Sequence, residues 1–196
     1  MQTHFCHSTL GTKLKVEVSL VLSLNHIPSL EIHDGLSNPQ SVGKPKFHNT
    51  YWKASENSLN HASSLTRNSK DKANLWVYLC YDTATYGTAG IAWMNSICRS
   101  KELSSSMNEK QSSAAGTAQL VAHEIGHNLG MSHDFDPQHG GQNGYCDCKG
   151  IMSYCNNAPQ RWSSCSRNDF KAHYNMNKGN WCLPSKSSLF IIIKVN

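Results

Sequence analysis

The sequence lacks long hydrophobic runs and is poor in acidic residues. Residues 1–10 contain no apolar core of the kind found in a secretory signal peptide. The apolar run 189–193 is far shorter than the roughly 20 residues of a membrane-spanning helix. Lys and Arg number 18 against 13 Asp and Glu, giving a net charge of +5, but they are scattered and accompany no nucleic-acid-binding motif. The sequence therefore predicts a solvated basic surface, no membrane span in this chain and no nucleic-acid partner.

The sequence also has no Asn-x-Ser/Thr glycosylation site and no internal repeat. It does have eight cysteines, which would be unusual in the reducing cytosol. A chain of 196 residues is long enough for one domain with a real core. We therefore expect a secreted, extracellular domain whose targeting segment lies outside this chain.

One segment, residues 123–134 with the sequence HEIGHNLGMSHD, carries most of the functional information. It continues a run of good helix formers in which Val121, Ile125 and Leu129 are spaced four residues apart. This spacing predicts an amphipathic helix whose apolar stripe faces a core.

The same segment predicts a catalytic zinc site. His123 and His127 are four residues apart, so one helical turn places both imidazoles on one face. Gly130 is suited to the left-handed conformation that ends a helix, and the resulting turn brings His133 back to the same point. Three nitrogen ligands leave the fourth position of the zinc open, as catalysis requires. Glu124 lies beside the first ligand, where it can serve as general base in metal-assisted amide hydrolysis. Alternatively these are ordinary histidines in a chain that has 11, but the third His at a fixed offset argues against that.

Two further features resemble a known family. Residues 150–154, GIMSY, resemble the Met-turn of the metzincin metallopeptidases, in which Met152 would form an apolar floor beneath the zinc. The residue directly after the third His separates the metzincin families, and here it is Asp134. In this the segment resembles the adamalysin or reprolysin family, which includes the snake-venom and disintegrin-like metalloproteinases. The resemblance covers about residues 12–184. It implies an α/β (α+β) fold with a twisted, mostly parallel mixed sheet, a zinc helix and a small irregular disulfide-bonded C-terminal subdomain that starts near Gly130.

The resemblance also divides the chain. It implies a remnant N-terminal segment (1–12), a metalloproteinase catalytic domain (13–184) and a C-terminal tail (185–196). The family domain normally begins with another strand and a long helix, so we expect the catalytic domain to be N-terminally incomplete. The tail is expected either to form a strand or to be unrelated to the domain.

Secondary structure is predicted from two sources. Hydrophobic spacing indicates a helix over about 51–66 and a buried strand over 75–81. The resemblance adds an early strand within 14–32, an edge strand near 88–94 and a C-terminal helix within 161–170.

Cysteine spacing alone does not fix the disulfide pairing. A structural zinc knuckle is one alternative, but gaps of one, six and nine residues between the four clustered cysteines fit it poorly. Cys6 and Cys80 would be paired together or free. The resemblance implies three bonds: Cys98 with Cys182, Cys146 with Cys165, and Cys148 with Cys155.

Two family features are weighed separately. The frequent calcium site is not carried over, because Ser185 stands near the expected Asn and the early segment is missing, although Asp71 matches the Asp. Tyr154 stands where the astacin relatives place a tyrosine near the metal. The adamalysin pattern does not use that tyrosine, so a pocket-wall aromatic is favoured.

We therefore expect a zinc metalloendopeptidase that cleaves internal peptide bonds of extracellular matrix or cell-surface proteins, with one catalytic Zn²⁺. Two alternatives stay open. One is a zinc-binding but inactive adhesion or toxin-like domain, against which the retained Glu124 argues. The other is a disulfide-rich structural module whose histidines never meet.

Overall fold

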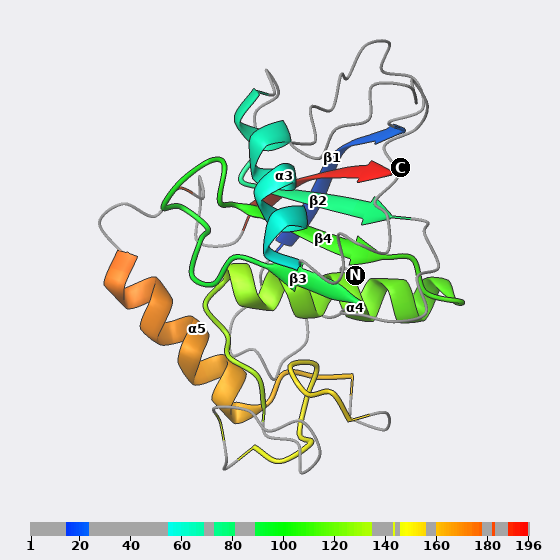
Figure 1. The fold of residues 1–196 in the computed structure, drawn as a ribbon. Helices are drawn as coiled ribbons and strands as arrows, with labels where there is room; N and C mark the ends of the chain where they lie inside the picture. Colours follow the sequence, from blue (N-terminus) through cyan, green and yellow to red (C-terminus); the bar gives the residue numbers. More distant parts are fainter. Residues whose placement is uncertain are drawn as a thin grey trace.

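The computed structural model describes residues 15–23, 55–68, 73–80, 89–134, 143, 146–155, 160–177, 182 and 188–195 (Figure 1). These residues form a mixed sheet with helices around it. In chain order the elements are β1 (Lys15–Ser23), α3 (Ser55–Asn68), β2 (Leu75–Cys80), β3 (Gly90–Ala92), β4 (Ser105–Glu109), α4 (Ala114–Asn128), α5 (Ser164–Asn177) and β5 (Ser188–Val195).

The sheet has the strand order β1-β5-β2-β4-β3. Four strands run parallel, and β3 at the edge pairs antiparallel with β4. The predicted mixed α+β fold with a mostly parallel sheet is confirmed. Because β3 is the last strand on its side, one of its edges is left without a partner strand among the described residues.

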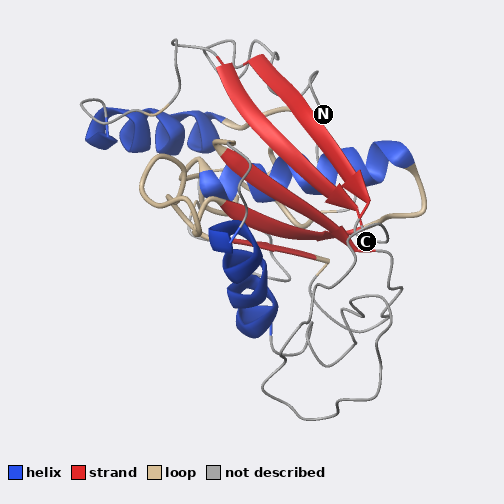
Figure 2. Ribbon diagram, turned by 90° about the horizontal axis from the view of Figure 1, so that it is seen from above, coloured by secondary structure: helices blue, strands red, loops and turns tan. Residues whose placement is uncertain are grey.

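Side chains of β2 alternate between two hydrophobic clusters, as the two-residue repeat of a strand requires. Leu75 and Val77 belong to the cluster that includes the α4 residues. Trp76 and Tyr78 belong to a second cluster, which contains Ala62 of α3. Figure 2 shows α3 and α4 on opposite sides of the sheet. Each helix therefore has its own core, and β2 is buried on both faces.

The zinc-motif helix is observed as α4, and it packs as predicted. Ser113 caps its N-terminus, because its Oγ accepts a hydrogen bond from the backbone N of Gly116 at 3.0 Å. The predicted apolar stripe of Val121, Ile125 and Leu129 is buried in the main cluster. Every residue of the C-terminal half of α4, from Val121 onward, is buried.

The other predicted elements are present, with shifted ends. The helix predicted over 51–66 is α3, the strand predicted over 75–81 is β2, and the edge strand is the short β3. The early strand is observed as β1, and the rest of its predicted range lies outside the described residues.

The C-terminal tail forms a strand of the sheet. β5 lies between β1 and β2 and is parallel to both, with Ile192 paired to Leu20 on one side and to Trp76 on the other. Of the two expectations for the tail, strand formation is confirmed.

Between Gly130 and α5 the structure describes residues 131–134, 143, 146–155 and 160–163. These residues form turns and one isolated bridge between Asp134 and Asn143. Cys6, the Cys80 side chain and the calcium candidates Asp71 and Ser185 lie outside the described residues. The structure contains the same three disulfide bonds that the resemblance implies: Cys98–Cys182, Cys146–Cys165 and Cys148–Cys155.

Candidate metal centre

The helix α4 presents two histidines on one face. His123 and His127 lie one turn apart, with ring centroids 4.9 Å apart, and each side chain is only 8% exposed. Burial lowers the pKa of both imidazoles, and together with the neighbouring histidines it lowers that of His127 to about 3. Both rings are therefore neutral at pH 7, the form in which imidazole binds a metal.

A sharp turn after α4 brings in the third histidine. Gly130 has a φ of +92°, a conformation that residues with a Cβ rarely adopt. A Cβ at this position would lie 2.5 Å from Asn95 Oδ1 and 2.7 Å from His173 Cβ. Glycine is therefore required both for its backbone conformation and for its lack of a side chain. The chain turns back at this point, so that His133 faces the helix.

The three imidazoles converge through their Nε2 atoms. The Nε2 atom of His133 lies 3.1 Å from that of His123 and 2.9 Å from that of His127. The Nδ1 atoms of the helical pair donate to backbone carbonyls, His123 to Ile151 at 2.7 Å and His127 to Met131 at 2.9 Å. A neutral ring that donates from Nδ1 has a lone pair on Nε2. Two Nε2 lone pairs therefore point toward the Nε2 atom of His133.

This donor set fits zinc. Zn–N bonds of about 2.0 to 2.1 Å in a tetrahedron separate the ligand nitrogens by roughly 3.3 Å, close to the spacing observed here. Metal-binding histidines usually donate their other ring N–H to a carbonyl or carboxylate, as His123 and His127 do. All three donor atoms lie within 4.8 Å of one another. The predicted ligands are thus assembled in one place.

Met152 is fully buried and packs against α4. Its backbone O accepts from the N of Asp134 at 3.0 Å, and its neighbour Ile151 is the residue that holds His123. A Cβ on Gly126 of α4 would come within 2.5 Å of Met152 Sδ. The turn therefore packs directly on the helix backbone, a role for Gly126 that the sequence analysis did not identify.

Glu124 lies in a narrow buried space beside the triad. Its side chain is 3% exposed, and Oε2 has no hydrogen-bond partner among the described residues. Burial raises the pKa of this carboxyl to about 8. A Cβ on Gly90 of the edge strand β3 would contact Oε1 and lie 2.8 Å from both Cγ and Cδ of Glu124. The lack of a side chain at Gly90 therefore leaves space for the Glu124 carboxylate. This role of Gly90 was also not identified from the sequence.

Asp134, which served only as a family marker in the sequence, has a structural role. Its side chain is fully buried, and Oδ1 accepts a hydrogen bond from Ser163 Oγ at 2.7 Å. Its pKa is raised to about 6, mainly by burial and also by the nearby Asp169, whereas the Ser163 hydrogen bond opposes both effects. Asp134 thus links two segments: the loop that contains His133 and the start of α5.

Tyr154 lies against the third histidine. Its hydroxyl is 2.9 Å from His133 Nε2 and 3.2 Å from Nδ1, and the ring centroids are 4.4 Å apart. The side chain is 48% exposed. The hydroxyl therefore reaches the point on which the imidazoles converge, a position that a purely apolar wall would not require.

The cysteines of the irregular segment do not form a second metal site. Asp134, Cys146 and Cys165 place potential ligand atoms close together. Both sulfurs are in one disulfide bond, however, and a disulfide is not the thiolate that zinc binds. The zinc-knuckle alternative is excluded for the same reason, because all four of its cysteines are in disulfides.

Comparison with known proteins agrees with this site. A reprolysin-type family model, described as metallo-peptidase family M12, matches residues 13–174. The chain is 37% identical over 98 residues to human disintegrin and metalloproteinase domain-containing protein 9, covering 50% of the chain and 11% of that protein. It is 32% identical over 173 residues to human "A disintegrin and metalloproteinase with thrombospondin motifs 10", covering 83% and 15%. It is 33% identical over 108 residues to a zinc metalloproteinase-disintegrin-like protein of Cerberus rynchops, covering 55% and 15%. The chain thus spans only a small part of each relative's length.

The packing of Met152 on α4 predicts that alanine is tolerated at one glycine of this helix and destabilising at another. Gly126→Ala inserts a methyl between α4 and Met152, and we expect a loss of about 1 to 3 kcal/mol in the free energy of unfolding. Gly116→Ala is the matched control, since its Cβ meets only side-chain atoms at 3.2 Å or more. Alanine is also the better helix former, so we expect a change of less than about 1 kcal/mol there. Denaturant unfolding of the oxidised protein measures both, and equal losses would contradict the close packing of Met152.

Proposed function

The chain belongs to the reprolysin branch of metallopeptidase family M12, and on this basis we propose that it is an active, secreted zinc endopeptidase. The family match makes it a metalloprotease domain. Activity of this particular chain is supported above all by Glu124, whose buried carboxylate stands next to the first of three converging histidines. A domain that only bound zinc would have no use for a carboxylate at that place.

The ligand role falls to His123, His127 and His133. Two of these rings are fixed by backbone carbonyls, so their Nε2 atoms are aimed before any metal arrives. Zinc bound there would lower the pKa of a water molecule and polarise the carbonyl of the scissile bond.

Glu124 would move the proton during hydrolysis. Its carboxylate accepts a proton from water as the water oxygen forms a bond to the carbonyl carbon of the substrate. The same carboxyl then gives that proton to the amide nitrogen as the C–N bond breaks. Burial by itself raises its pKa to about 8, so the charge of a bound zinc ion would be needed to favour the carboxylate form that accepts the proton. The products are a carboxylic acid and an amine, so atoms and protons balance.

Tyr154 would contribute a hydrogen bond at the same place. Its hydroxyl lies 2.9 Å from His133 Nε2, at the face where a substrate carbonyl would bind. A hydroxyl there can donate to the carbonyl oxygen as negative charge develops on it. We therefore give Tyr154 a part in the reaction rather than in the pocket wall alone.

Extracellular proteins are the proposed substrates. The three disulfide bonds suit an oxidising compartment. No helix among the described residues is long and apolar enough to pass through a membrane. The proposed site of action is therefore outside the cell, on matrix or cell-surface proteins.

Glu124→Gln tests the mechanism. The amide keeps the size of the side chain but cannot accept a proton, so we expect hydrolysis of a denatured, fluorescein-labelled protein to fall roughly 100- to 10,000-fold. Zinc content should stay unchanged, because Glu124 is not a ligand. Glu102→Gln is the control, since its carboxylate pairs with Arg67 at 3.9 Å on the surface and should leave the rate unaltered. Equal activity of the wild type, the Glu124→Gln variant and the chelated protein would sink the mechanism, and an inactive wild type with one bound zinc would favour the inactive domain.

Tyr154→Phe tests the hydroxyl alone, because the ring and its packing stay. We expect kcat for a peptide substrate to fall about tenfold or more while KM and zinc content change little. Steady-state kinetics with metal analysis measures this. An unchanged kcat would indicate that Tyr154 only forms part of the pocket wall.

A further inference from the structure

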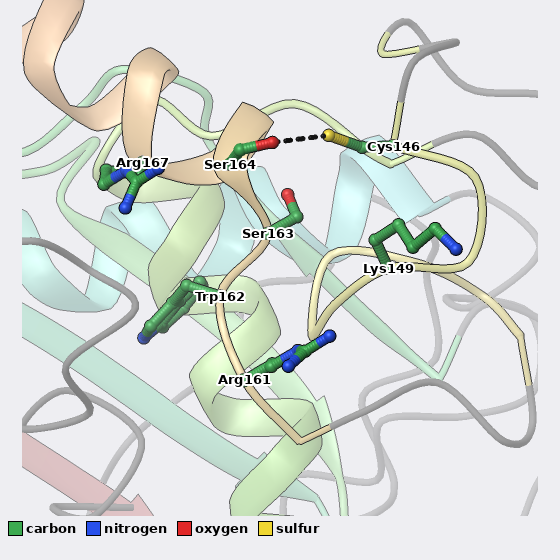
Figure 3. Close-up of a pocket in the computed structure, with 7 residues that line it drawn as sticks. All are labelled: Cys146, Lys149, Arg161, Trp162, Ser163, Ser164 and Arg167. Atoms are coloured by element: carbon green, nitrogen blue, oxygen red, sulfur yellow. Dashed lines mark hydrogen bonds between the residues drawn. The ribbon is translucent and has the colours of Figure 1, made fainter.

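A pocket outside the metal centre lies between the loop after Cys146 and the start of α5. It has a volume of about 370 Å³. Figure 3 shows its cationic side chains coming from separate segments, Lys149 from the loop, Arg161 from the chain before α5 and Arg167 from the first turn of α5. We name it the basic pocket, and its lining consists of Cys146, Lys149, Arg161, Trp162, Ser163, Ser164 and Arg167.

The basic pocket carries an excess of positive charge. Three of its seven lining residues are cationic and none is acidic. Lys149, Arg161 and Arg167 form no ion pair in the part of the chain that the structure describes. Asp147 and Asp169, each two residues from one of these cations, do not line the pocket. The buried carboxylate of Asp134 lies behind it and accepts a hydrogen bond from Ser163 at 2.7 Å. Folding thus gathers three cations that are spread over 19 residues of sequence, and an anion is the complementary occupant.

The walls of the basic pocket are held in place. Arg161 accepts a backbone hydrogen bond from Ile151 at 2.9 Å, and its neighbour Trp162 is 1% exposed. The bond between Cys146 and Cys165 ties the loop to α5. The charged side chains therefore extend from fixed backbone, which reduces the entropy lost when they bind a ligand.

The basic pocket is directly connected to the metal centre. The same Ile151 that donates to Arg161 holds His123 through its carbonyl and precedes Met152. Only one hydrogen-bonded strand of chain separates the cationic wall from the turn that contains Met152. Ile151 is 1% exposed, so buried chain separates the two sites, and a polypeptide bound at the metal centre would contact the pocket only with a segment that passes around this turn.

We propose that the basic pocket binds an acidic segment of the protein substrate and so selects substrates that carry Asp or Glu. This rests on the proposed endopeptidase function. Arginine binds carboxylates through two parallel hydrogen bonds, and two of the three cations are arginines. A compact hollow with three charges fits a few carboxylate side chains, whereas a sulfated polysaccharide would need an extended stripe of cations.

The test measures binding separately from cleavage. Two fluorescein-labelled peptides of equal length, one with a run of Glu and one with Gln at the same positions, are titrated by anisotropy against the Glu124→Gln protein. At low salt we expect the Glu peptide to bind roughly tenfold more tightly, the effect of a few partly exposed charge pairs, and 0.5 M NaCl to remove the preference. Adding Lys149→Gln, Arg161→Gln and Arg167→Gln together should abolish it at low salt.

Lys171→Gln is the matched control, because this exposed lysine lies on the same helix outside the pocket. It should keep the preference, and equal zinc content in all variants shows that they are folded. Equal affinity for both peptides, or a preference that survives the triple substitution, would overturn the proposal. Binding of heparin without any preference for the Glu peptide would also overturn it and assign the pocket to polysaccharide. A wild type that cleaves nothing would refute the proposed function while leaving the measured preference for the acidic peptide intact.

Discussion

The convergence of three imidazole nitrogens on one point is the interaction on which the rest of the structure depends. Carbonyls of Ile151 and Met131 fix the ring orientations of His123 and His127, so two buried lone pairs face the Nε2 atom of His133. A single proton on Nε2 of His133 can satisfy only one of these lone pairs, so the other lacks a partner there in a poorly solvated site. A bound cation can accept both lone pairs at once. The end of α4, the turn at Met152 and the loop at Asp134 are arranged around that charge.

Three glycines make this arrangement possible because they have no side chain. At Gly90 a Cβ would displace the Glu124 carboxylate, at Gly126 it would displace Met152, and at Gly130 it would meet His173. Only Gly130 also needs its unusual φ. Backbone from β3 and from α4 can therefore touch the functional side chains directly. This close approach keeps Glu124 buried and its pKa high.

Features of the fold and site that depend on local spacing could be predicted from the sequence. Features that depend on contacts between distant residues could not. The spacing of His123 and His127 and the stripe from Val121 to Leu129 are properties of one helix, so both could be predicted. The contact of Gly90 with Glu124 joins residues 34 positions apart on a strand and a helix, and no local pattern indicates it. The basic pocket was invisible for the same reason, because its cations are scattered in sequence. The position of β5 between β1 and β2 required the pairing of strands from opposite ends of the chain.

The metal content of the purified, oxidised wild-type protein tests the central claim most directly. A triad assembled by two backbone hydrogen bonds and one glycine turn should hold one zinc ion per chain after dialysis against metal-free buffer, measured by atomic emission. Replacing His133 with Ala should lower that content sharply without unfolding the domain, since this ring is the least buried of the three. A wild-type stoichiometry near zero, in protein shown to be folded, would contradict the account.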